Sequence, residues 1–140
     1  MLLSRLLRVM GGLICLSIVP IFLPLSWLEA AHAALGLGTA PQKVIFEYMA
    51  RTLSAMYFAH GVMVLAVAGD VHRYRPLIRV VARLNIFLGI LFLLIDCWAG
   101  MPVYWIAVEG PPIVAVGVLV RTLERKLGAE VPPLATTYSA

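Results

Sequence analysis

The chain has 140 residues, of which 62% are hydrophobic and only 13% are charged. This balance excludes an ordinary soluble domain and is typical of an integral membrane protein. At roughly 20 residues per helical span, the length allows about four crossings and no separate soluble domain. The formal net charge is +4, but the basic residues bracket apolar runs instead of forming a solvated patch, so we expect no nucleic-acid partner.

The first apolar run, residues 6–27, predicts the first membrane span. It follows Arg5, and it carries no charged residue after Arg8. A cleaved signal peptide is the alternative, because a basic start followed by "AHA" at residues 31–33 resembles a cleavage site. The apolar run is long for a signal peptide, and this length favours a retained span.

The segment "SWLEAAHAALGLG" predicts a short helix that lies at the membrane interface. Ser26 and Glu29 have the spacing of a capping box, in which each side chain bonds to the backbone N–H of the other. Gly36 suits the end of this helix, because glycine readily adopts the left-handed conformation found there.

Three further apolar runs predict the remaining spans. A second capping box in "TAPQ", with Thr39 as cap and Gln42 three residues later, starts one of them. Pro76 suits the first turn of the next, where a backbone N–H would be unpaired anyway. The predicted spans are residues 45–68, 77–98 and 103–120. Residues 128–140 lack apolar periodicity and predict a poorly ordered cytoplasmic tail, which leaves residues 1–127 as a single four-span domain.

Charge and aromatic residues predict the orientation. Nine of the 11 Lys and Arg residues fall on one side of the predicted membrane: Arg5, Arg8, Arg73, Arg75, Arg79, Arg83, Arg121, Arg125 and Lys126. Because positive residues concentrate on the cytoplasmic side, both termini are expected in the cytoplasm. Trp27, Trp98 and Trp105 fall near the opposite boundary, as in an aromatic belt.

Four charged residues fall within the predicted spans, all in the outer half of the membrane. They are Glu47, Arg51, Asp96 and Glu109. Glu47 and Arg51 are four residues apart, the spacing of an ion pair on one helical face. We expect a buried polar cluster in which Arg51 bridges Glu47 and either Asp96 or Glu109, because isolated charges in a membrane are costly.

This cluster has two interpretations. It can fix how the helices pack, because paired charges are costly to break once they are buried. Alternatively, the surplus of carboxylates over arginine can bind a proton, a cation or a cationic substrate. A metal site is not expected, since no His or Cys has ligand spacing to the acids. His60 lies on a different face of the second span, and its role stays open.

The fourth span contains the sequence Glu-Gly-Pro-Pro. Pro111 and Pro112 lack the backbone N–H groups that would bond to carbonyls about one turn earlier, so the helix is predicted to break at Gly110, Pro111 and Pro112. Glu109 would then lie near the positive end of a second half-helix that starts at Pro111. Broken helices of this kind line binding sites in transporters.

The segments "EYMARTLSAMY", "DVHRYRPLI", "DCWAGMPVYW" and "EGPP" together resemble small four-span membrane proteins of bacteria whose function is unassigned. The likeness covers about residues 20–120 and includes the four charged residues above. It implies a four-helix fold and a bacterial origin, but no chemistry. Small multidrug exporters are similar in length, but their essential carboxylate lies in the first span, where this chain has none.

The sequence therefore predicts an all-α, four-transmembrane-helix bundle with a short interfacial helix and a proline-broken fourth span. The expected function is that of a non-enzymatic accessory or structural membrane protein, without cofactors. Its expected partners are the lipid bilayer and, through helix packing, itself or a larger membrane complex. A small transporter or cation-binding protein that uses Asp96 and Glu109 is the alternative.

Overall fold

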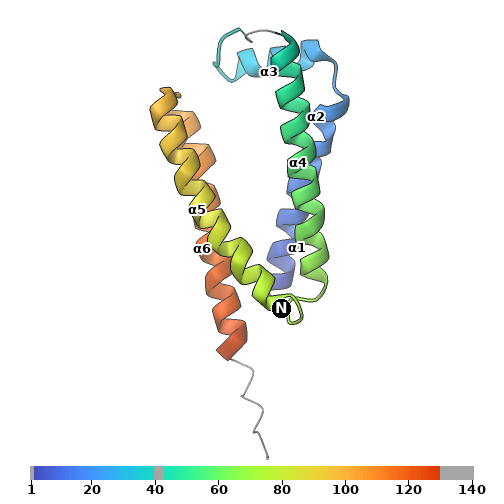
Figure 1. Ribbon diagram of the computed structural model, residues 1–140, viewed down its shortest axis with the longest axis vertical. Coiled ribbons are helices and arrows are strands. Elements are labelled where there is room, and N and C mark those ends of the chain that lie inside the picture. The colour runs from blue at the N-terminus through green and yellow to red at the C-terminus, as the bar shows by residue number, and fades with distance from the viewer. Residues whose placement is uncertain (1, 40–42, 130–140) are drawn as a thin grey trace, which may run out of the picture. The chain divides into compact units, whose positions relative to one another are not determined.

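The computed structural model describes residues 2–39 and 43–129, and all regular elements in these ranges are helices (Figure 1). In chain order they are α1 (Leu2–Cys15), η1 (Leu16–Ile18), α2 (Val19–Phe22), α3 (Leu25–Ala34), α4 (Lys43–Gly69), α5 (Arg75–Ala99) and α6 (Val103–Ala129). Four stretches are long and apolar enough to cross a membrane: Leu2–Phe22, Lys43–Gly69, Arg75–Ala99 and Val103–Ala129. The predicted all-α class, with four helices long and apolar enough to span a membrane, is confirmed.

The helices fall into two compact units. The first unit contains Leu3–Gly69, and the second begins at Asp70. The first is built around α1 and α4 and the second around α5 and α6, and each is described by itself. The single domain expected over residues 1–127 stays a prediction.

In the first unit, glycines bring α1 and α4 close together. A Cβ added to Gly61 would lie 3.0 Å from the carbonyl oxygen of Gly11, and a Cβ added to Gly11 would lie 3.1 Å from that of Gly61. The hydroxyl of Ser4 donates a hydrogen bond to the carbonyl of Ala68 at 2.8 Å. Small residues and interhelical hydrogen bonds of this kind hold membrane helices together, because lipid supplies no hydrophobic driving force between them.

The first span ends earlier than predicted, at Phe22. Leu23 is extended, with φ −71° and ψ 146°, as is usual for a residue that precedes proline. Pro24 then caps α3, and no side chain bonds to the N-terminus of that helix. The predicted capping box of Ser26 and Glu29 is therefore wrong, because the proline starts the helix two residues earlier and places Ser26 inside it.

Two side-chain contacts join α3 to the start of α4. The ring of His32 meets the ring of Phe46 edge to face, with 5.2 Å between centroids. Lys43 and Glu29 form an ion pair at 3.5 Å. Gly36, with φ 71°, follows the end of α3 as predicted for a helix stop. The interfacial position of this helix stays a prediction.

The ends of the other spans agree with the positions of glycine and proline residues in the sequence. α4 ends at Gly69, and Pro76 lies in the first turn of α5. Gly100 has the left-handed conformation, φ 70°, and ends α5 in the expected tight turn. The capping box predicted from "TAPQ" includes residues 40–42, which lie outside the described residues.

α5 and α6 form an antiparallel hairpin (Figure 1). Buried residues on their contact face recur at seven-residue intervals. The buried residues at this spacing are Ala82, Gly89 and Asp96 on α5 and Gly110, Gly117 and Glu124 on α6. A Cβ added to Gly117 would lie 2.9 Å from the carbonyl oxygen of Ala82, so the two backbones nearly touch. A seven-residue repeat is typical of helices that pack along their whole length in a left-handed supercoil. We call this face the α5–α6 seam.

The fourth span is one helix, with Pro111 and Pro112 inside it. The predicted break at Gly110, Pro111 and Pro112 is therefore not confirmed. Membrane helices tolerate internal prolines where a neighbouring helix supports the backbone, and Gly110 packs directly on α5 at this level. α6 also continues to Ala129, beyond the predicted end of the span at residue 120.

Candidate functional site

Arg51 connects α4 with the end of the first span. Its Nε and Nη2 donate to Oε1 of Glu47, one turn earlier on α4, at 3.0 and 2.8 Å. Its Nη1 donates to the carbonyl of Ile21, and its Nη2 also donates to that of Leu23 at 3.2 Å. One guanidinium therefore bonds to a carboxylate and to two backbone carbonyls, one in the last turn of α2 and one just after it.

The position of these carbonyls explains why a charged residue is needed there. The last C=O groups of a helix have no partner within it, and leaving them unpaired in apolar surroundings is costly. Pro24 prevents the helix from continuing, since Leu23 before it is extended. Arg51 supplies the missing donors, and Glu47 balances its charge in a partly buried environment.

The other two predicted site residues lie in the second unit. Glu109 accepts a hydrogen bond from the indole N–H of Trp105, one turn earlier on α6. Asp96 is 7% exposed, and its Oδ2 has no hydrogen-bond partner among the described residues. The bridge from Arg51 to Asp96 or Glu109 would join the two units and stays a prediction.

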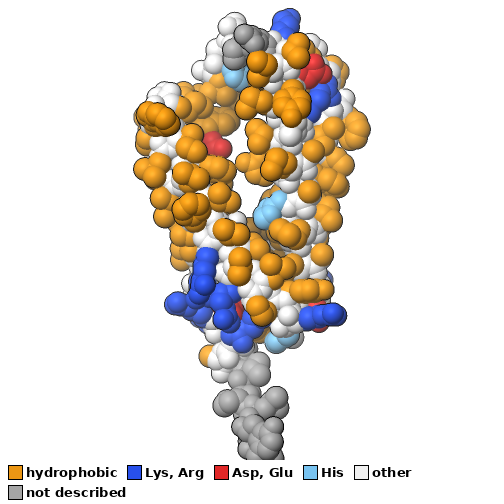
Figure 2. Space-filling model, viewed as in Figure 1, with side chains coloured by type: hydrophobic (Ala, Val, Ile, Leu, Met, Phe, Trp, Pro, Cys, Tyr) orange, Lys and Arg blue, Asp and Glu red, His pale blue; other side chains and the backbone are white. Residues whose placement is uncertain are grey.

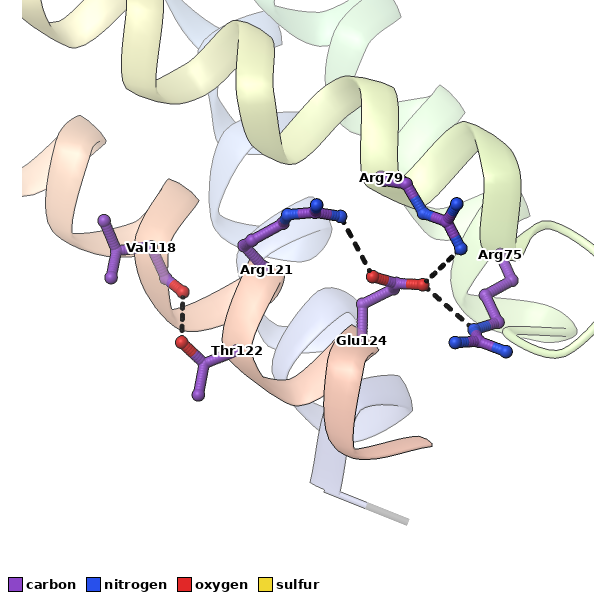
Figure 3. Close-up of polar contacts among 6 residues, drawn as sticks. All are labelled: Arg75, Arg79, Val118, Arg121, Thr122 and Glu124. Atoms are coloured by element: carbon purple, nitrogen blue, oxygen red, sulfur yellow. Dashed lines mark hydrogen bonds and ion pairs between the residues drawn. The ribbon is translucent and has the colours of Figure 1, made fainter. Parts of the chain in front are cut away.

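The sequence analysis missed Glu124, whose side chain is only 1% exposed. Its Oε1 accepts hydrogen bonds from Nε of Arg75 at 2.9 Å and from Nη2 of Arg79 at 3.1 Å. Its Oε2 accepts one from Nη1 of Arg121 at 3.2 Å. Figure 3 shows the three arginines pointing toward this one carboxylate, two from α5 and one from α6. We call these four residues the Glu124 cluster.

Glu124 was missed because the predicted fourth span stopped at residue 120, which put the following charges outside the membrane. The repeat along the seam is the signal that could have found it. Glu124 follows Gly117 at the same seven-residue interval that separates Gly117 from Gly110, so it stays on the face that packs against α5. Arg75 and Arg79, four residues apart, share one face at the start of α5.

The surroundings of the Glu124 cluster are strongly basic. Arg121 interacts electrostatically with Arg79, Arg83 and Arg125 as well as with Glu124. Figure 2 shows Lys and Arg side chains gathered at this end of the second unit, where α5 begins and α6 ends. Like charges at short range repel, so the buried carboxylate is what allows the guanidinium groups to lie so close together.

Over residues 2–39 and 43–129, no group of three or more His, Cys, Asp or Glu side chains is placed to hold a metal ion. The four long apolar helices are compatible with a multi-pass membrane protein. No family model, curated protein or solved structure matches the chain.

Proposed function

We propose that this chain is an accessory or structural protein of a bacterial inner membrane, with both termini in the cytoplasm. In this role it carries out no enzymatic reaction and acts by packing its helices against copies of itself or against a larger membrane complex. The lipid bilayer is its other partner. Lipid-facing helices can associate through close van der Waals packing and a few polar contacts, which are the interactions seen within each unit.

The observation that supports this proposal is the use of charged side chains as ties between helices. Arg51 holds α4 to the end of α2, and Glu124 holds α6 to α5. The guanidinium of Arg51 and the carboxylate of Glu124 each make several hydrogen bonds of this kind, so they stabilise packing and have little capacity left for a substrate. Large apolar side chains such as Met56, which is 65% exposed, are available on α4 for contact with lipid or another helix.

The proposal is tested by purifying the full chain in mild detergent and weighing the intact assemblies by native mass spectrometry. We expect a fixed stoichiometry, either of this chain with itself or with another membrane protein. A strictly monomeric chain in several mild detergents and in lipid nanodiscs would contradict the packing role.

A second function, a small transporter or a proton- or cation-binding protein, is favoured by one observation. Asp96 is buried in the last turn of α5, and its Oδ2 has no partner among the described residues. A carboxylate in apolar surroundings needs a donor, a proton or a cation. Glu109, in the same unit, would be the second carboxylate of such a site.

The two functions are separated by cation-dependent thermal stability. If Asp96 binds a cation, a monovalent or divalent chloride salt raises the melting temperature of the wild type and not that of Asp96→Asn at equal ionic strength. Glu29→Gln is the matched control, because it also removes one carboxylate and its ion pair with Lys43 is on the surface. Equal salt responses in all three proteins would remove the support for the second function.

A further inference from the structure

The Glu124 cluster leaves positive charge uncompensated. Three guanidinium groups surround one carboxylate, and each is bonded to it through a single nitrogen: Nε of Arg75, Nη2 of Arg79 and Nη1 of Arg121. Because a guanidinium carries five N–H donors, these bonds use only a minor part of the donors present. Nε of Arg79 is itself buried and has no hydrogen-bond partner among the described residues.

Further arginines add to this excess. Arg83 and Arg125 are close enough to Arg121 to act on it electrostatically, and neither forms an ion pair in the described part of the chain. The local charge therefore exceeds that of the three arginines bonded to Glu124. Such a concentration of arginine around one buried acid favours a second anion, which would bond to the remaining donors and reduce the repulsion.

We infer that the Glu124 cluster, together with Arg83 and Arg125, binds a phosphate-bearing anion. The planar guanidinium fork matches the geometry of phosphate oxygens and bonds to two of them at once. Glu124 orients the arginines, and the phosphate takes up donors that they do not use for Glu124. The group can come from the headgroup of an anionic lipid or from free phosphate, and both have the same recognition chemistry.

The need to orient the chain in the membrane does not by itself account for the arrangement of arginines around Glu124. Orientation in a membrane requires positive residues near the ends of spans, without any fixed geometry among them. At this site a buried carboxylate holds three arginines from two helices within 3.2 Å of its oxygens. The inference is independent of the packing role proposed above, since a protein can bind a lipid phosphate whether or not it assembles with another protein.

The test compares two variants of the full chain that each lose two positive charges. Arg83→Gln with Arg125→Gln, here called the cluster variant, removes two charges beside the Glu124 cluster that are not bonded to Glu124, so the hairpin contacts stay in place. Arg5→Gln with Arg8→Gln is the matched control, with both changes on α1. Each protein in mild detergent is titrated with phosphatidylglycerol or phosphatidylcholine, and the thermal melting temperature and native mass spectrum are recorded.

We expect phosphatidylglycerol, and not phosphatidylcholine, to stabilise the wild type and the α1 control. The cluster variant should need roughly 30-fold more phosphatidylglycerol for the same effect, because it loses the attraction of two positive charges for the anionic headgroup. A separate titration with inorganic phosphate, compared with chloride at equal ionic strength, shows whether the phosphate group comes from a lipid or from free phosphate. If phosphate alone reproduces the stabilisation, free phosphate is sufficient, and if only the lipid does, the headgroup is the ligand.

Two results would overturn the inference. One is an equal loss of phosphatidylglycerol binding in both double variants, because the effect would then reflect net charge and not this site. The other is an absence of stabilisation by phosphatidylglycerol and by phosphate alike. If the cluster variant does not fold, Arg83→Gln alone replaces it, with Arg8→Gln as its control, and the same comparison is made.

Discussion

Gly89 and Gly110 lie backbone against backbone across the α5–α6 seam. A Cβ added to Gly110 would be 2.7 Å from the carbonyl oxygen of Gly89, and a Cβ added to Gly89 would be 2.8 Å from the carbonyl oxygen of Gly110. Real Cβ atoms do not approach a backbone oxygen so closely, and a carbonyl cannot rotate away as a side chain can. The seam therefore requires glycine at both positions, and the requirement can be tested.

Gly110→Ala should destabilise the second unit by about 1–3 kcal/mol, because the added methyl group forces the helices apart. Gly12→Ala is the matched control, since a Cβ at Gly12 meets nothing within 4 Å. Alanine has a higher helix propensity than glycine, so the control should melt at the wild-type temperature or above it. Thermal denaturation in detergent measures the stability of both variants. Equal melting temperatures for Gly110→Ala and Gly12→Ala would contradict the close approach of the two helices.

Arg51→Gln should cost more stability than Glu47→Gln. The arginine change leaves two carbonyls at the end of α2 without donors, for a loss of about 1–3 kcal/mol. The glutamate change removes only a partly exposed ion pair, worth less than about 1 kcal/mol. Chemical denaturation of the two variants and of the double variant measures the difference. If Glu47→Gln were as damaging as Arg51→Gln, the contact with the carbonyls would not be the main role of Arg51.

Glu124→Gln should lower stability by about 3 kcal/mol, because it leaves three arginines facing one another without a counter-charge. Adding Arg121→Gln to this variant should restore part of the loss by removing one of the unbalanced cations. Glu29→Gln, which breaks only a partly exposed pair with Lys43, should change stability by less than about 1 kcal/mol. Melting temperatures of the four proteins test this, and no gain from the second change would indicate that repulsion is not the cause.

Asp96→Asn should leave the melting temperature unchanged or raise it. The amide has the shape of the carboxylate but no charge, and Oδ2 of Asp96 has no hydrogen bond in the described residues to lose. A loss of more than about 1 kcal/mol would show that Asp96 has a cationic partner. The sequence predicts that Arg51 bridges Glu47 and either Asp96 or Glu109, so the experiment also tests one form of this predicted bridge.

Replacing Pro111 and Pro112 together with alanine should maintain or raise stability. α6 is continuous through both prolines, and alanine restores two backbone N–H donors to a helix that already exists. Each proline in a helix interior is unfavourable by about 3 kcal/mol relative to alanine, although packing reduces the gain. Circular dichroism and thermal melting measure the outcome, and a marked destabilisation would indicate that the prolines shape a required bend.

The spanning helices could be predicted because each is bounded by residues with strong local preferences. Gly69 ends α4, Pro76 lies in the first turn of α5, and Gly100 adopts the left-handed conformation that ends it. These preferences belong to the residue itself and do not depend on the rest of the fold. The ion-pair spacing of Glu47 and Arg51 is a local property of the same kind, and the two side chains lie 2.8 Å apart.

The features that could not be predicted depend on which helices meet. The contacts of Arg51 with Ile21 and Leu23 require the end of α2 to lie beside α4, and no residue near Arg51 indicates this. Glu124 is surrounded by positive residues in the sequence, a pattern that is usual for a solvated segment. Only the pairing of α5 with α6 makes it a buried residue.

The repeat of small residues along the α5–α6 seam also bears on the alignment of the hairpin. With glycine or alanine at seven-residue intervals, a shift of α6 by one repeat would again bring small residues against α5. Such a shift would move Glu124 to the level of Ile86, away from Arg75 and Arg79, and of its three arginines it would keep only Arg121, which is on the same helix. Glu124 and its arginines thus select a single register in which the hairpin can close, a choice that glycine packing alone would leave open.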